Sequence, residues 1–257
     1  MVSCYLQGGL GNYMFQIAAA DVLAKKNNTT SIFFVDMAVK VHKSIYDYAD
    51  NIFRNVKLVK GNPNISNVYH ESKFTHSVIP YMPNLMMVGY FQTEKYLKGY
   101  EEYIRSVFSP RKEDVDYIES KYGDLLDKKT CSIHVRRGDY LNLKDHHPPC
   151  GVGYYENAFD FMDDDTTYLV FSDDIGWCKE TFTGEQFVFI EDELDYIDLY
   201  LMSMCDNNII ANSSFSWWAA WLNKNNDKIV VAPNKWFGKS KAGVDTSDII
   251  PKKWVKI

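Results

Sequence analysis

Short apolar runs alternate with amphipathic segments along the second half of the chain. Apolar runs bounded by turn residues are typical of buried strands, and apolar residues spaced by one helical turn indicate helices. The pattern predicts strands at residues 131–135, 168–171, 187–190, 209–211 and 229–232. It predicts helices at residues 154–162, 177–182, 193–205 and 217–222. Because strands and helices alternate at this spacing, we expect right-handed crossovers, a parallel sheet and an α/β fold.

The first half of the chain has a weaker pattern. Strands are predicted at residues 2–7, 31–35, 56–59, 68–69 and 85–90, and helices at 14–26, 93–108 and 113–126. Residues 38–83 show little periodicity, and most of that segment is expected to be loop. The polar run Asp127-Lys128-Lys129 comes just before the strand at 131–135, and domain boundaries fall in such polar segments. We therefore predict one domain at residues 1–127 and a second at residues 128–257.

The composition narrows the function classes. Apolar residues make up 46% and charged residues 24% of the chain, as in ordinary globular proteins. The net charge of −6, without a basic run, argues against nucleic acid as the main partner. No apolar stretch is long enough to span a membrane and no signal-peptide pattern is present, so we expect a cytoplasmic protein, with peripheral membrane contact left open. The five cysteines lack metal-ligand spacing, which indicates reduced thiols.

Two adjacent arginines stand at the end of the predicted strand 131–135. Arg136 and Arg137 are followed by Gly138, which predicts a turn, and by Asp139. Ligands of open α/β sheets bind at the carboxyl ends of strands, and the planar guanidinium group matches phosphate oxygens bidentately. The motif therefore suggests an anionic ligand. A surface ion pair between Arg137 and Asp139 explains the spacing equally well.

Polar clusters follow two other predicted strands. Asp173 and Asp174 end the strand at 168–171, and the turn 212–216 precedes a predicted helix. Because all strands of a parallel sheet end at one edge, these clusters can converge with Arg136. Hydroxyl and N–H groups at a helix N-terminus bind anions, so the combined site suits a diphosphate, with one aspartate on the base or ribose. Taken alone, the serine-rich turn is explained as well by a helix N-cap.

A glycine-rich turn joins the first predicted strand to the first predicted helix. Its sequence is Gly8-Gly9-Leu10-Gly11-Asn12. Glycines let the backbone approach a ligand closely, but this turn lacks the dinucleotide fingerprint and the lysine of a P-loop. A tight turn with close packing is an equally good explanation.

Four motifs, in order along the chain, resemble those of glycosyltransferase family 11, the α-1,2-fucosyltransferases. They are Gly8-Gly9-Leu10-Gly11-Asn12-Tyr13-Met14-Phe15-Gln16, His134-Val135-Arg136-Arg137-Gly138-Asp139-Tyr140, Phe171-Ser172-Asp173-Asp174, and the stretch from Leu201-Met202-Ser203 to Asn212-Ser213-Ser214-Phe215-Ser216-Trp217-Trp218-Ala219-Ala220-Trp221-Leu222. The resemblance implies a GT-B fold, with two Rossmann-like domains facing across a cleft, the first on the acceptor side and the second binding GDP-sugar. It also implies an inverting transfer, without metal or cofactor, of L-fucose from GDP-L-fucose to a glycan hydroxyl, with O2 of a terminal β-galactoside as the expected acceptor.

The resemblance further implies roles for individual residues. Arg136 would hold the β-phosphate, with Arg137 in support and His134 near the nucleotide. Asn12 would approach the donor sugar. The other implied donor-binding residues are Gly9, Gly11, Asp173, Asp174, Ser213, Ser214, Phe215 and Ser216. The family usually has Gln where this chain has Tyr13, so the contacts of that position are open.

The general base is not identified by any pattern. Charge develops on the leaving β-phosphate, where Arg136 and the N–H groups of the serine-rich turn would stabilise it. A carboxylate or a histidine would take the proton of the acceptor hydroxyl. Asp139 is the base that we favour, so the catalytic candidates are Arg136, Asp139 and Asn12. Asp36, Asp145 and His146 are alternatives, and a dissociative transition state would need no strong base.

Two other functions fit the sequence. The same scaffold could bind a nucleotide sugar or a glycan without catalysis, which the Tyr13 substitution keeps open. A metal-dependent transferase would use Asp163-Asp164-Asp165 to bind the metal–diphosphate. That run precedes a predicted strand instead of ending one, so a solvated loop explains it better, and we expect no metal site.

Overall fold

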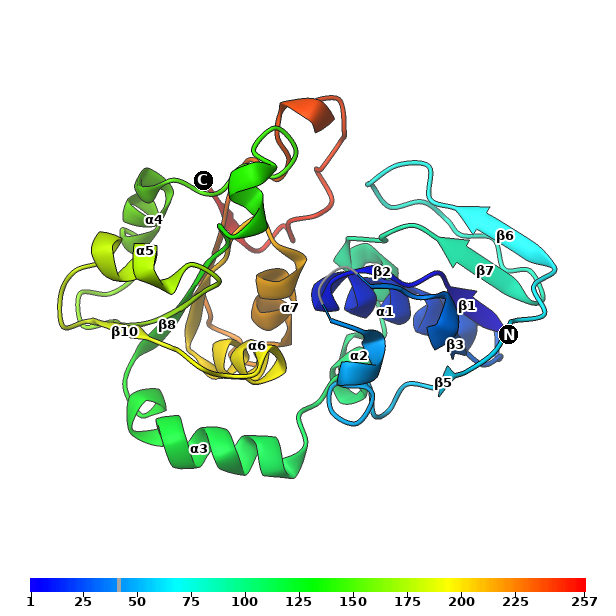
Figure 1. Ribbon diagram of the computed structural model, residues 1–257, viewed down its shortest axis with the longest axis horizontal. Helices are drawn as coiled ribbons and strands as arrows, with labels where there is room; N and C mark the ends of the chain where they lie inside the picture. The colour runs from blue at the N-terminus through cyan, green and yellow to red at the C-terminus, as the bar shows by residue number, and fades with distance from the viewer. Residues whose placement is uncertain (41–42) are drawn as a thin grey trace. The chain divides into compact units, whose positions relative to one another are not determined.

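The computed structural model describes residues 1–40 and 43–257. The chain divides into two compact units (Figure 1). The first contains residues 1–110 and 244–251, and the second contains residues 111–243 and 252–257. Among the described residues, no helix is long and apolar enough to cross a membrane.

The second unit is built on six parallel strands in the order β10-β9-β8-β11-β12-β13. Their bounds are β8 (Thr130–Val135), β9 (Thr167–Ser172), β10 (Phe187–Phe189), β11 (Asn207–Ile209), β12 (Val230–Ala232) and β13 (Val255–Lys256). In chain order these are strands 3-2-1-4-5-6, the order of the Rossmann fold. The strand order reverses between β8 and β11, and ligands of such sheets bind outside the carboxyl ends of the strands at this switch point.

Helices cover both faces of this sheet (Figure 1). The helices of this unit are α3 (Lys112–Leu126), α4 (Val152–Phe159), α5 (Ile175–Thr181), α6 (Asp195–Met204) and α7 (Ser214–Leu222), with short 3₁₀ helices η4 (Asp139–Asn142) and η5 (Lys239–Lys241). Of these, α4 and α5 lie on one face of the sheet, and α6 and α7 lie on the other (Figure 1). Every residue of β8 is buried, as expected for a central parallel strand covered on both faces. The alternation of side chains along β8 places Ile133 and Val135 in the core with α4 and α5, and His134 beside α7.

The first unit contains a three-stranded parallel sheet in the order β1-β7-β6 and two shorter parallel pairs, β2-β4 and β3-β5. The strands are β1 (Val2–Cys4), β2 (Gln7–Gly8), β3 (Phe33–Phe34), β4 (Val39–Lys40), β5 (Leu58–Val59), β6 (Asn67–His70) and β7 (Leu85–Val88). The helices are α1 (Leu10–Lys26) and α2 (Glu101–Val107), with 3₁₀ helices η1 (Val35–Met37), η2 (Ile45–Tyr48) and η3 (Glu94–Leu97).

The segment 244–251 returns to complete the first unit. Asp248 accepts a hydrogen bond from the backbone N–H of His76 at 2.8 Å and pairs with Lys95. Ile249 is fully buried. Residues 252–257 then return to the second unit, where β13 pairs with β12 at the edge of the sheet.

The predicted parallel α/β architecture is confirmed, but several predicted boundaries differ from the structure. The units divide after residue 110, whereas the sequence placed the boundary after residue 127. Helix α3 belongs to the second unit because Lys121 and Tyr122 both contact Glu193, which precedes α6. The helix predicted at 93–108 is two helices, η3 and α2, because Gly99 between them has a φ of +82°, which ends a helix.

Candidate functional site

Arg136 lies directly beyond the carboxyl end of β8, between two carboxylates. The registers of β8 and β9 pair Val135 with Ser172, so the next residues along each strand, Arg136 and Asp173, are neighbours. Arg136 Nη1 is 2.9 Å from Asp173 Oδ2, and Nη2 is 2.7 Å from Asp139 Oδ1. The Arg136 side chain is 24% exposed, so its charge is held in place but remains accessible.

Asp173 also holds the loop that follows β8. Its Oδ1 accepts hydrogen bonds from the backbone N–H groups of Arg137 at 2.8 Å and Gly138 at 3.1 Å. A Cβ atom at Gly138 would lie 2.6 Å from Asp173 Oδ2. Glycine is therefore needed at position 138 for the backbone to approach Asp173 this closely. The predicted turn at Gly138 is held to the end of β9 by the Asp173 carboxylate.

Arg137 points to the other face of the sheet, as alternation along the chain requires. Its Nε is 2.9 Å from Asp174 Oδ2, and its guanidinium carbon lies 4.0 Å from the centre of the Trp177 ring. The ion-pair partner of Asp139 is thus Arg136, where the sequence suggested Arg137. The contact of Arg137 with Trp177 could not be predicted from the sequence, where Trp177 is only an apolar residue of a predicted helix.

His134 is a buried, neutral histidine beside the arginines. Its side chain is 6% exposed and its ring centre is 5.5 Å from that of Phe215. Burial, followed by the charge of Arg136, lowers the pKa of His134 to about 4. Its Nδ1 has no hydrogen-bond partner among the residues that the structure describes. His134 therefore places this buried polar atom next to Arg136, on a ring that carries no charge at neutral pH.

We expect His134 to make the protein sensitive to acid. A histidine whose pKa is lower when folded binds fewer protons than in the unfolded chain between about pH 4 and pH 6.5. The contribution of neutral His134 to the free energy of unfolding is therefore fully present above pH 6.5 and is lost as the pH falls towards 4. The free energy of unfolding should drop by about 2–3 kcal/mol between neutral pH and pH 4.5 because of this group. Denaturant titrations at both pH values should show a smaller drop for His134→Asn, while exposed His70→Asn should behave like the wild type.

The serine-rich turn forms the N-terminus of α7 at the end of β11. Ser213 is the N-cap, and its Oγ accepts a hydrogen bond from the N–H of Phe215 at 3.3 Å. Ser216 is fully buried and its hydroxyl donates to the carbonyl of Ser213 at 3.4 Å. Ser214 and Phe215 are partly exposed at the first turn of the helix. The turn therefore caps α7, as the simpler of the two explanations predicted. It also places the N-terminus of that helix at the switch point of the sheet.

In the first unit, Asn12 lies in the first turn of α1 and not in a loop. Gly9 is the N-cap, and Gly11 is a buried helical residue. Gln92 donates a hydrogen bond from Nε2 to Asn12 Oδ1 at 2.7 Å. Gly8 has a φ of +95°, and a Cβ there would collide with the Asn12 side chain. The glycine-rich turn thus packs closely around Asn12, and Gln92 is a second residue that the sequence did not single out.

Tyr13 belongs to the core of the first unit. Its side chain is fully buried, and its hydroxyl donates to the carbonyl of Val39 at 3.1 Å. The departure from the family pattern at this position therefore places an aromatic ring in the protein interior.

The other acidic candidates have structural partners. Asp36 accepts hydrogen bonds from Tyr46 at 3.0 Å and from the N–H of Gly61 at 2.7 Å, and the latter lowers the pKa of Asp36. Asp163 and Asp165 both pair with Lys129, at 3.0 and 2.8 Å. Within residues 1–40 and 43–257, no group of three or more His, Cys, Asp or Glu side chains is arranged to hold a metal ion.

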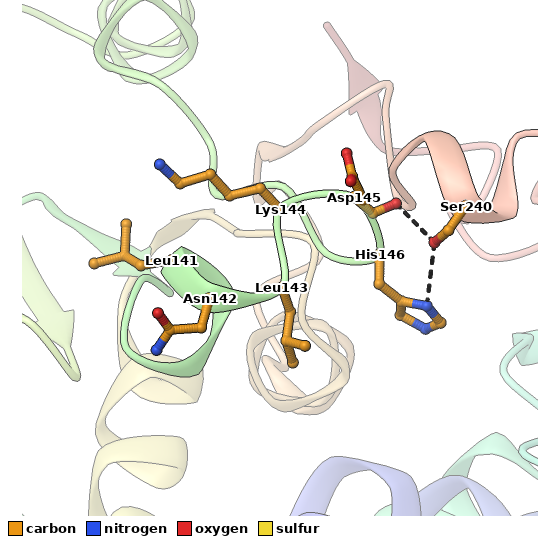
Figure 2. A pocket seen from close by; sticks show the side chains of 7 residues that line it. All are labelled: Leu141, Asn142, Leu143, Lys144, Asp145, His146 and Ser240. Atoms are coloured by element: carbon orange, nitrogen blue, oxygen red, sulfur yellow. Dashed lines mark hydrogen bonds between the residues drawn. The ribbon is translucent and has the colours of Figure 1, made fainter.

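Asp145 and His146 line a hollow in the second unit, of about 410 Å³ (Figure 2). It is formed by the loop that follows η4, together with Ser240 of η5. Leu141 and Leu143 give it an apolar part, with exposed fractions of 36% and 47%. The complete lining consists of Leu141, Asn142, Leu143, Lys144, Asp145, His146 and Ser240.

Comparison with known proteins identifies similar sequences over the whole chain. The model of the family described as glycosyl transferase family 11 matches residues 1–257. The Escherichia coli O-antigen biosynthesis glycosyltransferase WbnK is 30% identical, with all of both chains aligned. The Escherichia coli alpha-1,2-colitosyltransferase is 31% identical over 100% of this chain and 99% of its own.

A solved structure shares the fold. The fucosyltransferase NodZ from Bradyrhizobium superposes with a TM-score of 0.55, at 12% identity, over 85% of this chain and 92% of its own. At that identity the likeness concerns the fold alone. It confirms the GT-B class predicted from the sequence.

Proposed function

The chain belongs to glycosyl transferase family 11, and from this membership we propose that it moves L-fucose from GDP-L-fucose to a glycan hydroxyl with inversion at carbon 1. Family membership makes it a glycosyltransferase, so the non-catalytic alternative is set aside. Tyr13, which kept that alternative open, is a core residue.

The observation that carries the donor half of the proposal is the position of Arg136 at the Rossmann switch point. The β8–β11 crevice is where such a sheet binds a nucleotide. Arg136, a neutral histidine and the N-terminus of α7 stand around it, and Arg137 follows on the other face of the sheet. A diphosphate there would meet a guanidinium group and a helix N-terminus, the two arrangements that proteins use for phosphate.

The proposed reaction uses these groups to stabilise the leaving group. As the bond between carbon 1 and the β-phosphate oxygen breaks, negative charge grows on that phosphate. Arg136 is preorganised by Asp139 and Asp173, so it need not reorganise as the charge develops. Arg137, held by Asp174 and Trp177, adds a second fixed positive charge, and Asp173 or Asp174 is left as the candidate for base or ribose contacts.

A specific observation favours a second donor. The alpha-1,2-colitosyltransferase is similar over its whole length, and colitose is fucose without the 3-hydroxyl group. We rank GDP-fucose first on the motif resemblance and treat GDP-colitose as its competitor. For the acceptor, we propose O2 of a terminal β-galactoside in a surface glycan.

The donor is tested by melting and by transfer. GDP should raise the melting temperature and UDP should not, because a ligand that binds only the folded state stabilises it by about 2.7 kcal/mol at a hundredfold excess over Kd. Transfer from GDP-fucose and from GDP-colitose to a β-galactoside is then followed by NMR of the product linkage. Equal melting shifts with GDP and UDP, or no transfer from either sugar nucleotide, would contradict the proposal.

We also propose that transfer needs no metal ion. A leaving diphosphate must be neutralised by a divalent cation or by fixed positive groups, and Arg136 and Arg137 supply the latter. Activity should therefore be unchanged after treatment with EDTA and after adding back Mg²⁺ or Mn²⁺. Loss with EDTA and recovery with metal would make Asp173 or Asp174 a metal ligand.

A further inference from the structure

The loop after η4 is fixed to η5 by three hydrogen bonds. The N–H of Ser240 donates to the carbonyl of Asp145 at 2.8 Å, and the N–H of Gly238 donates to the carbonyl of His146 at 2.9 Å. The Ser240 hydroxyl lies 2.7 Å from the same Asp145 carbonyl. His146 therefore stands on a backbone that is held from both sides, at the edge of the hollow (Figure 2).

These bonds favour the neutral tautomer of His146 that carries its proton on Nδ1. The Asp145 carbonyl can only accept, so the single proton of the Ser240 hydroxyl is donated to it. A hydrogen bond between His146 Nδ1 and the Ser240 oxygen, 3.4 Å apart, then requires Nδ1 to be the donor. In neutral imidazole the other nitrogen is the acceptor. His146 Nε2, which lies on the side of the ring away from Ser240 in Figure 2, thus carries a lone pair.

A row of side chains connects His146 to the candidate diphosphate site. The Arg136 guanidinium lies 5.5 Å from the centre of the Tyr140 ring. Tyr140 stacks on His147 with ring centres 4.8 Å apart. The ring centres of His147 and His146 are 4.4 Å apart. The hollow is therefore connected, within the second unit, to the arginine that we assign to the leaving phosphate through the rings of Tyr140 and His147.

The rival bases in this unit are less suited to taking a proton. The Asp139 carboxylate is already engaged by Arg136, at 2.7 Å. His147 lies between Tyr140 and Phe237, and burial lowers its pKa to about 4. The Asp145 carboxylate points away from His146 and Ser240 in Figure 2. His146 is partly exposed and lines the hollow.

We propose that His146 is the general base of the transfer and that the hollow lined by residues 141–146 holds the acceptor sugar, an inference that rests on the proposed function. It places the acceptor on the second unit, whereas the family resemblance implied the first domain. Leu141 and Leu143 face the apolar C–H side of the sugar, and polar side chains meet its hydroxyls. The acceptor O–H proton passes to His146 Nε2 while the acceptor oxygen bonds to carbon 1 of the donor sugar. The bond from carbon 1 to the β-phosphate breaks, and GDP leaves with its electron pair. The imidazolium then returns its proton to solvent.

The test uses the full chain with GDP-fucose and a β-galactoside. His146→Ala should lower kcat for transfer about 10²-fold, the usual contribution of a general base. Its melting shift with GDP should match the wild type, since the nucleotide site is elsewhere. Added imidazole should restore part of the rate. Exposed His70→Ala on β6 is the matched control and should transfer normally.

Ser240 gives an independent measurement. Ser240→Ala removes the group that sets the tautomer and should lower kcat several-fold, whereas Ser240→Thr keeps a hydroxyl and should recover most of it. If His146→Ala melts below the assay temperature, His146→Gln, which keeps a polar side chain, is assayed in its place.

Wild-type turnover in a folded His146 variant would overturn the assignment, as would a rate loss that imidazole does not relieve. A wild-type protein that transfers no deoxy sugar would instead contradict the proposed function.

Discussion

Arg136→Ala is expected to abolish measurable transfer and to weaken GDP binding. Removal of one preorganised group that stabilises the transition-state charge usually costs about 10²–10³ in rate. Here the loss should be at the upper end, because the substitution also leaves Asp139 and Asp173 beside an incoming diphosphate without the charge that neutralises them. The site would then repel the donor.

Charge and geometry can be separated at this position. Arg136→Lys keeps the positive charge but loses the fork that spans the two carboxylates, so it should recover GDP binding better than kcat. Transfer rates and GDP affinity by calorimetry measure both effects. Arg54, an exposed arginine that bonds to the Ser109 carbonyl, provides the control Arg54→Ala. Near-normal turnover of Arg136→Ala would remove the central claim about the donor site.

Gly138→Ala should reduce transfer by about 10²-fold, although it adds only one methyl group. The new Cβ would meet Asp173 Oδ2 at 2.6 Å, and this carboxylate is already bound by Arg136 and by two backbone N–H groups. It cannot move aside without breaking those bonds. The arginine that we assign to the phosphate would then lose its preorganisation, whose loss has effects of this size.

The matched control is Gly153→Ala in α4, where an added Cβ meets nothing within 4 Å. It should retain activity and be neutral or slightly stabilising, as alanine is the better helix former. Asp173→Asn should reproduce part of the Gly138→Ala defect, since the amide keeps one acceptor but loses the charge. Equal activity of Gly138→Ala and Gly153→Ala would show that the contacts of Asp173 with Arg136 and the loop after β8 are unimportant for transfer.

The ends of β8 and β9 could be predicted from the sequence to within one residue because each strand is a nearly continuous apolar run. The contact between Arg136 and Asp173 needed one further fact, the register that pairs Val135 with Ser172. The contact of Trp177 with Arg137 was beyond prediction for the same reason, since it depends on how α5 leaves β9. His134 gave no sign of its neutral state, because burial next to an arginine is a property of the packed sheet.

The first unit was harder to predict because its strands are short. Two-residue pairs such as β3-β5 bury too few side chains to produce an alternation that stands out from loop.

In the second unit, β13 was missed because Val255 and Lys256 form an edge strand with one apolar residue. The boundary at residue 127 followed local polarity, whereas the structure is divided by the tertiary contacts of Glu193 with α3.

The return of residues 244–251 to the first unit affects the order in which the protein can be completed during synthesis. Domains usually fold as they emerge from the ribosome, N-terminal first. Here the first unit lacks Ile249 and the partner of Lys95 until nearly the whole second unit has been translated. A ribosome stalled after residue 110 would expose a unit still missing part of its own core, and a protease should cleave it more readily than the same residues in the finished chain.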